Sequence, residues 1–210
     1  MGKRILCYGD SNTWGYIGGC GQRYPSDVRW TGRLQKMFPE YTIIEEGMNG
    51  RTTVFDDPLT PGCNGLTYLT PCLLSQAPLD MVIICIGTND LKCVAGHKAG
   101  ASAQGAGMLI AKTREILGKD IPILLISPVW IGYERKDQGP LWVLDESCYE
   151  QSRMFPFFFG AIATQYGCYF LDAQQFAEPG HTDAVHMDEP NHEKFANAVA
   201  EKIREILGNE

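Results

Sequence analysis

Apolar runs alternate with amphipathic stretches along this chain, and this alternation constrains its fold more than any other feature. The run Met81–Ile86 is continuous and rich in β-branched residues, which is typical of a strand buried on both faces. Four further apolar runs are predicted to be strands: Ile5–Tyr8, Thr42–Glu45, Ile123–Ser127 and Cys168–Leu171. The intervening and final stretches have helical spacing: Val28–Phe38, Asn64–Ala77 (from near Leu66), Ala103–Leu117, Glu146–Tyr166 (distorted near Pro156) and Pro190–Leu207.

Strands separated by helices predict a parallel sheet whose right-handed crossovers cover both faces. The expected fold is therefore α/β, with a five-stranded parallel sheet between two helical layers. The 210 residues are enough for one such domain and short for two. The sequence contains no linker, internal repeat or low-complexity tract, so we predict a single domain over residues 1–210. Residues 128–145 are predicted to be irregular, because glycine and proline interrupt them.

Charge and cysteine content exclude several classes of function. The net charge is −7 and no basic run occurs, which argues against nucleic acid or an anionic membrane as a partner. No apolar stretch approaches the ~20 residues of a membrane span. The apolar run behind Lys3 and Arg4 breaks at Gly9, too early for a signal peptide, so we expect a cytoplasmic protein. The eight cysteines are scattered without a CxxC pair, and we interpret them as buried reduced thiols rather than disulfides or zinc ligands.

Polar residues follow four of the predicted strands. They are Gly9–Asn12 after the first strand, Gly47–Thr52 after the second, Gly87–Asp90 after the third and Asp183–His186 beyond the fifth. The carboxyl ends of parallel strands lie at one edge of the sheet, where α/β proteins bind their ligands. We therefore expect these four stretches to meet.

Together these stretches contain the groups that acyl transfer requires. The hydroxyl of Ser11 needs a base to become a nucleophile, and His186 is the one histidine with an aspartate three residues before it. Asp183 is thus predicted to orient the imidazole. A glycine peptide N–H, an asparagine amide and the N–H of the nucleophile itself are suitable donors to an oxyanion. Asp10 is expected to organise the turn, and His192 to cap the last helix or face solvent.

These stretches resemble the four motif blocks of the SGNH hydrolases, also called the GDSL esterase/lipase family. The blocks read "YGDSNTWG", "GMNGRTT", "IGTND" and "DAVH" here, in the order of the family. The resemblance implies a flavodoxin-like α/β/α fold with Ser11 as nucleophile, His186 as base and Asp183 as its acid. It also implies that the backbone N–H groups of Ser11 and Gly50 and the side chain of Asn89 form the oxyanion hole. The usual leucine after the serine is Asn12 here, which would change the polarity of the pocket.

Other phrases are similar to the arylesterase and acyltransferase subgroup of bacterial SGNH enzymes: "RYPSDVRWTGRL", "EEGMNGRTT" and "LDMVIICIGTND". This resemblance implies a serine esterase acting on short acyl esters, acetyl esters above all, through an acyl-serine intermediate. It leaves accompanying acyl transfer open. It further implies a small-molecule ester substrate, a compact homo-oligomer, and no metal or organic cofactor.

Alternative interpretations remain for the site and for the function. Taken alone, Ser11 could be a helix N-cap and Asn89 a turn residue. Trp14 is predicted to line the acyl pocket with Asn12, whereas Tyr133 and Trp142 could wall the site or meet a neighbouring subunit. The main rival function is a carbohydrate O-acetyl esterase with the same triad, which the polar stretch 133–138 favours. A non-catalytic flavodoxin-like module is the rival from another class, although neither a P-loop nor a GxGxxG sequence follows the first strand.

Overall fold

Five parallel strands form the centre of the molecule. The computed structural model describes residues 2–92, 94, 96–133 and 143–208. In these residues the sheet has the order β2-β1-β3-β4-β5, and every neighbouring pair of strands is parallel. The strands are β1 (Arg4–Gly9), β2 (Thr42–Gly47), β3 (Met81–Cys85), β4 (Ile123–Ser127) and β5 (Tyr169–Asp172). The sheet that the apolar runs predict is thereby confirmed.

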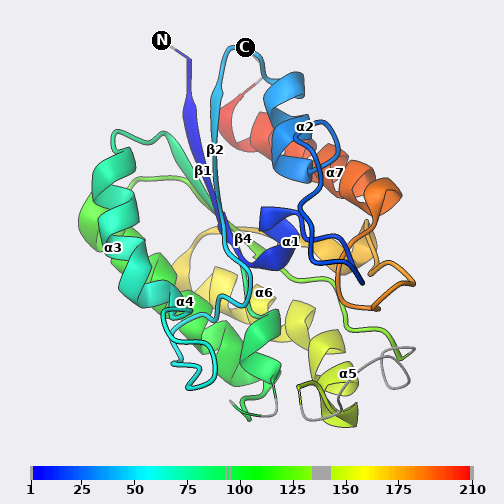
Figure 1. Ribbon diagram of the computed structural model, residues 1–210. Helices are drawn as coiled ribbons and strands as arrows, with labels where there is room; N and C mark the ends of the chain where they lie inside the picture. The colour runs from blue at the N-terminus through cyan, green and yellow to red at the C-terminus, as the bar shows by residue number, and fades with distance from the viewer. Residues whose placement is uncertain (1, 93, 95, 134–142, 209–210) are drawn as a thin grey trace.

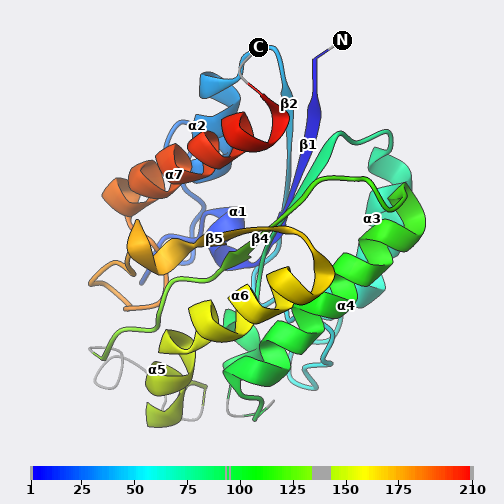
Figure 2. The ribbon, with the colours of Figure 1, turned by 180° about the vertical axis from the view of Figure 1, so that it is seen from behind.

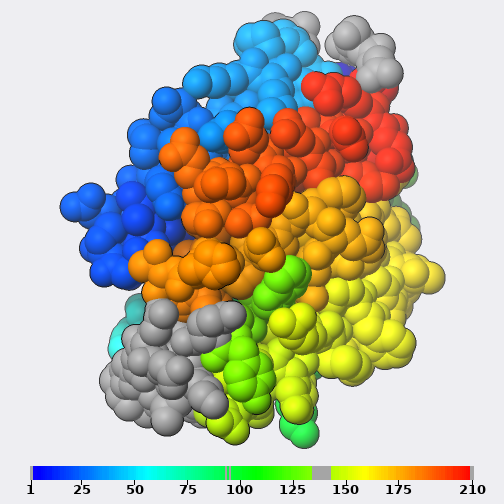
Figure 3. Space-filling view, turned by 90° about the vertical axis from the view of Figure 1, so that its right-hand side faces the viewer, coloured from blue at the N-terminus to red at the C-terminus, as the bar shows by residue number. Residues whose placement is uncertain are grey.

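Helices cover both faces of the sheet, as Figures 1 and 2 show. One layer contains α3 (Gly65–Gln76), α4 (Ala99–Leu117) and α6 (Phe155–Tyr166), and the other contains α2 (Trp30–Met37) and α7 (Glu189–Leu207). Figure 3 shows α7 across the outer surface of the second layer. The shorter helices are α1 (Ser11–Trp14), η1 (Thr88–Leu91), α5 (Glu146–Arg153) and η3 (Ala173–Gln175). No helix in the described part of the chain is long and apolar enough to cross a membrane.

Alternate residues of each strand supply two separate cores. Leu6 and Val82 face α3, α4 and α6, whereas Ile5 and Ile83 face α2 and α7. All four side chains are fully buried. Successive side chains of a strand point to opposite faces, so a strand covered on both sides must be apolar throughout. This is why the strands appear in the sequence as continuous apolar runs.

Several helix boundaries differ from the sequence prediction. The predicted helix 146–166 is divided into α5 and α6, because Pro156 lacks the N–H that would continue one helix through this point. The helix predicted to begin at Ala103 begins at Ala99, which is itself buried in the core. Among the described cysteines, Cys7, Cys63, Cys72 and Cys85 are buried free thiols as predicted, whereas Cys20 is exposed and Cys168 is only partly buried.

His192 is buried, and the expectation that it caps the helix or faces solvent is wrong. The first turn of α7 is capped by Asp188, whose side chain accepts a hydrogen bond from the Asn191 N–H. His192 instead points into the protein, where its ring meets Tyr24 edge-on at a centroid distance of 5.4 Å. Burial, with a smaller contribution from the positive charge of Arg33, lowers the pKa of His192 to about 3.

We therefore expect His192 to make the protein less stable in acid. Its folded pKa lies below the ordinary value of about 6.5, so the unfolded chain binds the additional proton first, and stability falls as the pH drops from 6.5 toward 3. Between pH 7 and pH 5 the loss attributable to this group is about 2 kcal/mol. Urea unfolding of wild type and His192→Phe at both pH values measures it. Equal pH slopes for the two proteins would contradict this expectation.

Candidate active site

Ser11 is the first residue of α1 and lies just beyond the carboxyl end of β1. Asp10 caps this helix as expected, because its Oδ1 accepts a hydrogen bond of 3.0 Å from the Asn12 N–H. The turn is tight: a Cβ on Gly9 would lie 2.5 Å from the carbonyl oxygen of Cys85. Burial raises the pKa of Asp10 to about 6, although the Asn12 N–H and the charge of His186 oppose this shift. The Ser11 side chain is thereby presented at the edge of the sheet.

His186 and Asp183 extend from Ser11 as a continuous hydrogen-bonded chain. The Nε2 of His186 is 2.9 Å from Ser11 Oγ, and its Nδ1 is 2.7 Å from Asp183 Oδ2. The other carboxylate oxygen, Oδ1, accepts the backbone N–H groups of Val185 and His186 at 3.0 and 2.9 Å. Burial alone would raise the pKa of Asp183, but its bonds to His186 outweigh burial and lower it. The structure thus brings together the three residues that the sequence predicts as a triad.

The loop that carries His186 is fixed in a strained conformation. Ala184 adopts a φ of 54°, which is uncommon for a residue other than glycine. Its carbonyl accepts a hydrogen bond from the Gly132 N–H, and its own N–H donates to Gly180. The His186 carbonyl in turn accepts from the Gly180 N–H at 2.8 Å. These bonds on both sides of the strained residue hold the imidazole in place.

Asn12 does not line the cavity over Ser11, contrary to the prediction. It instead joins the turn that carries Ser11 to the loop that carries His186. Its Nδ2 donates to the carbonyl of Val185 at 3.3 Å, and its Oδ1 accepts the Met187 N–H at 2.9 Å. The side chain is buried between the two segments. A leucine here could make neither bond, so the amide gives Asn12 a positioning role that sequence reasoning missed.

Gly50 and Asn89 are the residues expected to supply oxyanion donors beside Ser11. Gly50 has a φ of +77°, a conformation that favours glycine, and a Cβ there would lie 3.3 Å from Cys63 Sγ. Asn89 belongs to η1, and its Nδ2 donates one hydrogen to the carbonyl of Arg51 at 3.1 Å. Both residues line the same cavity as Ser11. An amide nitrogen carries two hydrogens, so a second donor remains for the cavity.

Arg51 supports this side of the site and was not identified from the sequence. It is fully buried, and its Nη1 donates to the carbonyl oxygens of Gly9 (2.8 Å) and Glu46. Its guanidinium lies over the Tyr8 ring at 4.3 Å from the centroid. Arg51 therefore ties the loop after β2 to the end of β1. The sequence signal for this supporting role was an arginine between small residues inside the "GMNGRTT" block.

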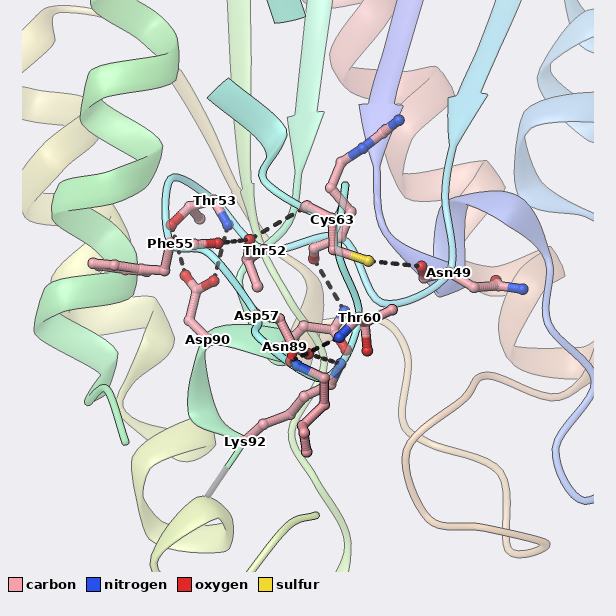
Figure 4. A network of polar contacts seen from close by, with 12 residues as sticks. Asn49, Thr52, Thr53, Phe55, Asp57, Thr60, Cys63, Asn89, Asp90 and Lys92 are labelled. Carbon is pink, nitrogen blue, oxygen red and sulfur yellow. Dashed lines mark hydrogen bonds and ion pairs between the residues drawn. The ribbon is translucent and has the colours of Figure 1, made fainter. Parts of the chain in front are cut away.

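A cavity of about 490 Å³ opens over these groups and contains every predicted triad and oxyanion residue. Tyr16 forms one wall, with its ring 4.3 Å from the His186 ring. Lys92 also lines the cavity, and its ammonium donates to Asp57 Oδ2 at 3.1 Å, as Figure 4 shows. Val143 and Leu144 add an apolar surface. The cavity thus combines an apolar wall with fixed polar donors.

Trp14, in contrast to the prediction, does not line this cavity. Gly15 adopts a left-handed conformation that ends α1 directly after Trp14. Arg23 covers Trp14: its Nε donates to the Trp14 carbonyl at 2.6 Å, and its guanidinium lies 5.3 Å from the ring centroid. Tyr16, two residues later, occupies the position expected for Trp14.

The segment after β4 can be described only in part. Trp142 and residues 134–138, for which roles were predicted, lie outside the described residues. Tyr133 packs against Tyr149 at a centroid distance of 5.0 Å and does not line the cavity.

Comparison with known proteins identifies the family. A family model described as the GDSL-like Lipase/Acylhydrolase family matches residues 7–194. The chain belongs to this family. Among solved structures, an aryl esterase from M. smegmatis is 32% identical with a TM-score of 0.89, over 97% of this chain and 99% of that chain. The carbohydrate acetylesterase Est24 from Sinorhizobium meliloti is 30% identical with a TM-score of 0.88, over the same shares. A sequence comparison with curated proteins gave no match.

This GDSL-like protein is therefore a carboxylic ester hydrolase. Family membership confirms the resemblance read from the four blocks and the α/β fold that it implies. It also sets aside the non-catalytic flavodoxin-like module as a rival interpretation.

Proposed function

We propose that the chain hydrolyses short-chain, acetyl-type esters through an acyl-Ser11 intermediate. The observation that carries this proposal is the pair of contacts at His186, 2.9 Å to Ser11 Oγ and 2.7 Å to Asp183 Oδ2. A serine hydroxyl within hydrogen-bond distance of an imidazole that is itself oriented by a carboxylate is the arrangement that activates a nucleophile.

Each step of the proposed reaction uses a group already in position. Ser11 Oγ attacks the ester carbonyl carbon while His186 Nε2 takes its proton. The tetrahedral intermediate collapses, and the imidazolium returns this proton to the leaving alcohol. Water then attacks the acyl-serine with His186 again as base, which releases the acid and restores Ser11. Asp183 keeps Nδ1 protonated, so that Nε2 faces the serine as an acceptor.

The N–H groups of Ser11 and Gly50 and the Nδ2 of Asn89 are proposed to stabilise the oxyanion. Asn89→Ala is expected to lower kcat by roughly 10²–10³, because one fixed donor to the developing charge is lost. Initial rates with p-nitrophenyl acetate measure the effect, and thermal unfolding should change little. Asn49→Ala is a matched control that lines the same cavity, and it should lower kcat far less. Full activity combined with a less stable fold in Asn89→Ala would show that Asn89 is a turn residue only.

Tyr16 is proposed to limit the length of the acyl group. Its ring lies against His186 beside the nucleophile, where a long acyl chain would need room. We expect kcat/KM to fall steeply from acetyl to octanoyl p-nitrophenyl esters and Tyr16→Ala to flatten this profile. Each methylene group that the pocket accepts or excludes changes the activation free energy for kcat/KM by about 1–3 kcal/mol. Trp14→Ala, outside the cavity, should leave the profile unchanged. A wild type that prefers octanoyl esters would contradict the short-chain proposal.

A carbohydrate O-acetyl ester is the second candidate substrate. Est24, similar over nearly the whole chain, is named a carbohydrate acetylesterase. The cavity also presents polar side chains away from the triad, including Lys92 and Asn49, which could bind hydroxyl groups. Release of acetate from acetylated xylo-oligosaccharides, compared with p-nitrophenyl acetate hydrolysis, separates the two substrate classes. Acyl transfer is tested in the same assay by adding a second alcohol and measuring the new ester.

We further propose that the enzyme is a cytoplasmic homo-oligomer of one-domain chains that uses no metal or organic cofactor. The resemblance to the arylesterase and acyltransferase subgroup supports this assembly. Large apolar side chains such as Phe157, Leu59 and Leu74 are exposed and could form contacts between subunits. Light scattering during size-exclusion chromatography measures the number of subunits.

A further inference from the structure

Asp90 lies buried behind the proposed oxyanion donors and contacts the segments that carry them. Its Oδ1 accepts the Thr53 N–H at 2.8 Å, and its Oδ2 lies 2.7 Å from Thr53 Oγ1 and 2.6 Å from Ser102 Oγ. Figure 4 shows the two bonds to Thr53. Thr53 lies three residues after Gly50 in the loop after β2, and Asp90 is the residue next to Asn89. Asp90 therefore links the Gly50 loop, the Asn89 turn and α4.

The donors and acceptors available in this cluster indicate the charge of Asp90. Ser102 Oγ also lies 2.9 Å from the carbonyl oxygen of Gly87, which can only accept a hydrogen bond. A hydroxyl has one hydrogen, so Ser102 cannot donate fully to both Gly87 and Asp90. Both short contacts are satisfied when Ser102 donates to Gly87 and accepts a hydrogen from Asp90 Oδ2. Thr53 then donates its own hydroxyl hydrogen to Oδ2.

We propose that Asp90 is a protonated, neutral carboxylic acid in the folded enzyme, and that it positions Asn89 and the Gly50 loop for oxyanion stabilisation. The carboxyl group is completely buried, and the side chains that hydrogen-bond to it, those of Thr53 and Ser102, are uncharged. Burial raises the pKa of Asp90, although the hydrogen bonds that Ser102 and Thr53 could donate to an ionised carboxylate and the nearby His97 oppose the shift. Asp10, itself a buried carboxyl, repels a second negative charge here.

A neutral Asp90 suits the reaction proposed for this site. A carboxylate directly behind Asn89 would repel the negative charge that develops on the substrate oxygen, and in a buried setting that repulsion is weakly screened. A carboxylic acid makes the same structural bonds without that charge. The positioning role rests on the proposed oxyanion role of Asn89 and Gly50, whereas the protonation state does not.

Stability as a function of pH tests the protonation state without any assay of activity. The amide of Asp90→Asn matches the carboxylic acid in shape and is neutral at every pH. If Asp90 is neutral when folded, its folded pKa lies above its unfolded value of about 3.9, so wild type loses stability relative to Asp90→Asn as the pH rises above 4. The folding equilibrium constants of the two proteins then diverge by about tenfold per pH unit, up to the folded pKa. Asp10 and His97 titrate in both proteins, and only the change that the charge of Asp90 makes to their titration enters the difference. A wild type that gains stability relative to Asp90→Asn above pH 4 would overturn the proposal.

Kinetics with p-nitrophenyl acetate test the positioning role. Asp90→Asn should keep kcat close to that of wild type, whereas Asp90→Ala should lower kcat on the order of 10² with little change in KM, because the oxyanion donors move. Ser102→Ala, which removes the hydroxyl between Asp90 and the Gly87 carbonyl, should also lower kcat. This variant replaces Asp90→Ala as the test if Asp90→Ala does not fold. An Asp90→Asn variant as impaired as Asp90→Ala, or a folded Asp90→Ala with wild-type kcat, would show that Asp90 has no such role. If Ser11→Ala were still active, the proposed function would fail while the stability measurement would stand.

Discussion

Ser11→Ala should lower the kcat of ester hydrolysis by a factor of about 10⁶ and leave the fold intact. Without the hydroxyl no acyl-enzyme can form, and His186 has no nucleophile to deprotonate. The side chain is small, and its Oγ contacts His186 at the edge of the active-site cavity rather than the hydrophobic core. Its loss therefore leaves no void in the core. The measurement is turnover of p-nitrophenyl acetate together with thermal unfolding of both proteins.

Mass spectrometry provides an independent measurement for the same variant. Wild type mixed briefly with the ester should carry an added acetyl group, and Ser11→Ala should not. Ser75→Ala is a suitable control, because this serine lies near the end of α3, outside the four motif blocks, and its hydroxyl donates to the Cys72 carbonyl of the same helix. Near wild-type turnover by Ser11→Ala would remove the basis of the proposed mechanism.

Asp183→Asn should lower kcat on the order of 10⁴ while the loop around it keeps its shape. The carbonyl oxygen of asparagine can still accept the N–H groups of Val185 and His186, which Oδ1 accepts in wild type. The amide NH₂ would then face His186 Nδ1. Because an NH₂ group only donates, Nδ1 becomes the acceptor and Nε2 carries the hydrogen toward Ser11. The imidazole can no longer take the serine proton.

Asp188→Asn is the matched control for this substitution. It changes the same residue type five positions away, at the N-cap of α7, where an asparagine can still cap the helix. Its activity should stay close to that of wild type, and the unfolding curves of both variants should resemble that of wild type. If Asp183→Asn retained most of its kcat, the orienting role of Asp183 would be wrong.

The strands, their parallel arrangement and the chemistry of their carboxyl ends were predictable from the sequence. A strand buried on both faces must be apolar at every position, so Met81–Cys85 is visible as a run without any knowledge of its neighbours. Parallel strands end at one edge, so polar residues that follow separate strands converge there. This local information was enough to predict that Ser11, Asn89 and His186 lie together, and all three line one cavity.

Contacts between segments far apart in the sequence were decided by the tertiary structure. Asn12 appeared to be a pocket residue, but its partners Val185 and Met187 lie more than 170 positions away, and only the packed loops reveal them. Trp14 was misplaced because its contacts with Arg23, in the following loop, are visible only in the folded chain. His192 looked like a surface residue of a helix start, until the packing of α7 against α2 buried it. Periodicity and strand ends are set by residues that are neighbours in the sequence. Burial and hydrogen-bond partners depend instead on which distant segments the fold packs against a residue.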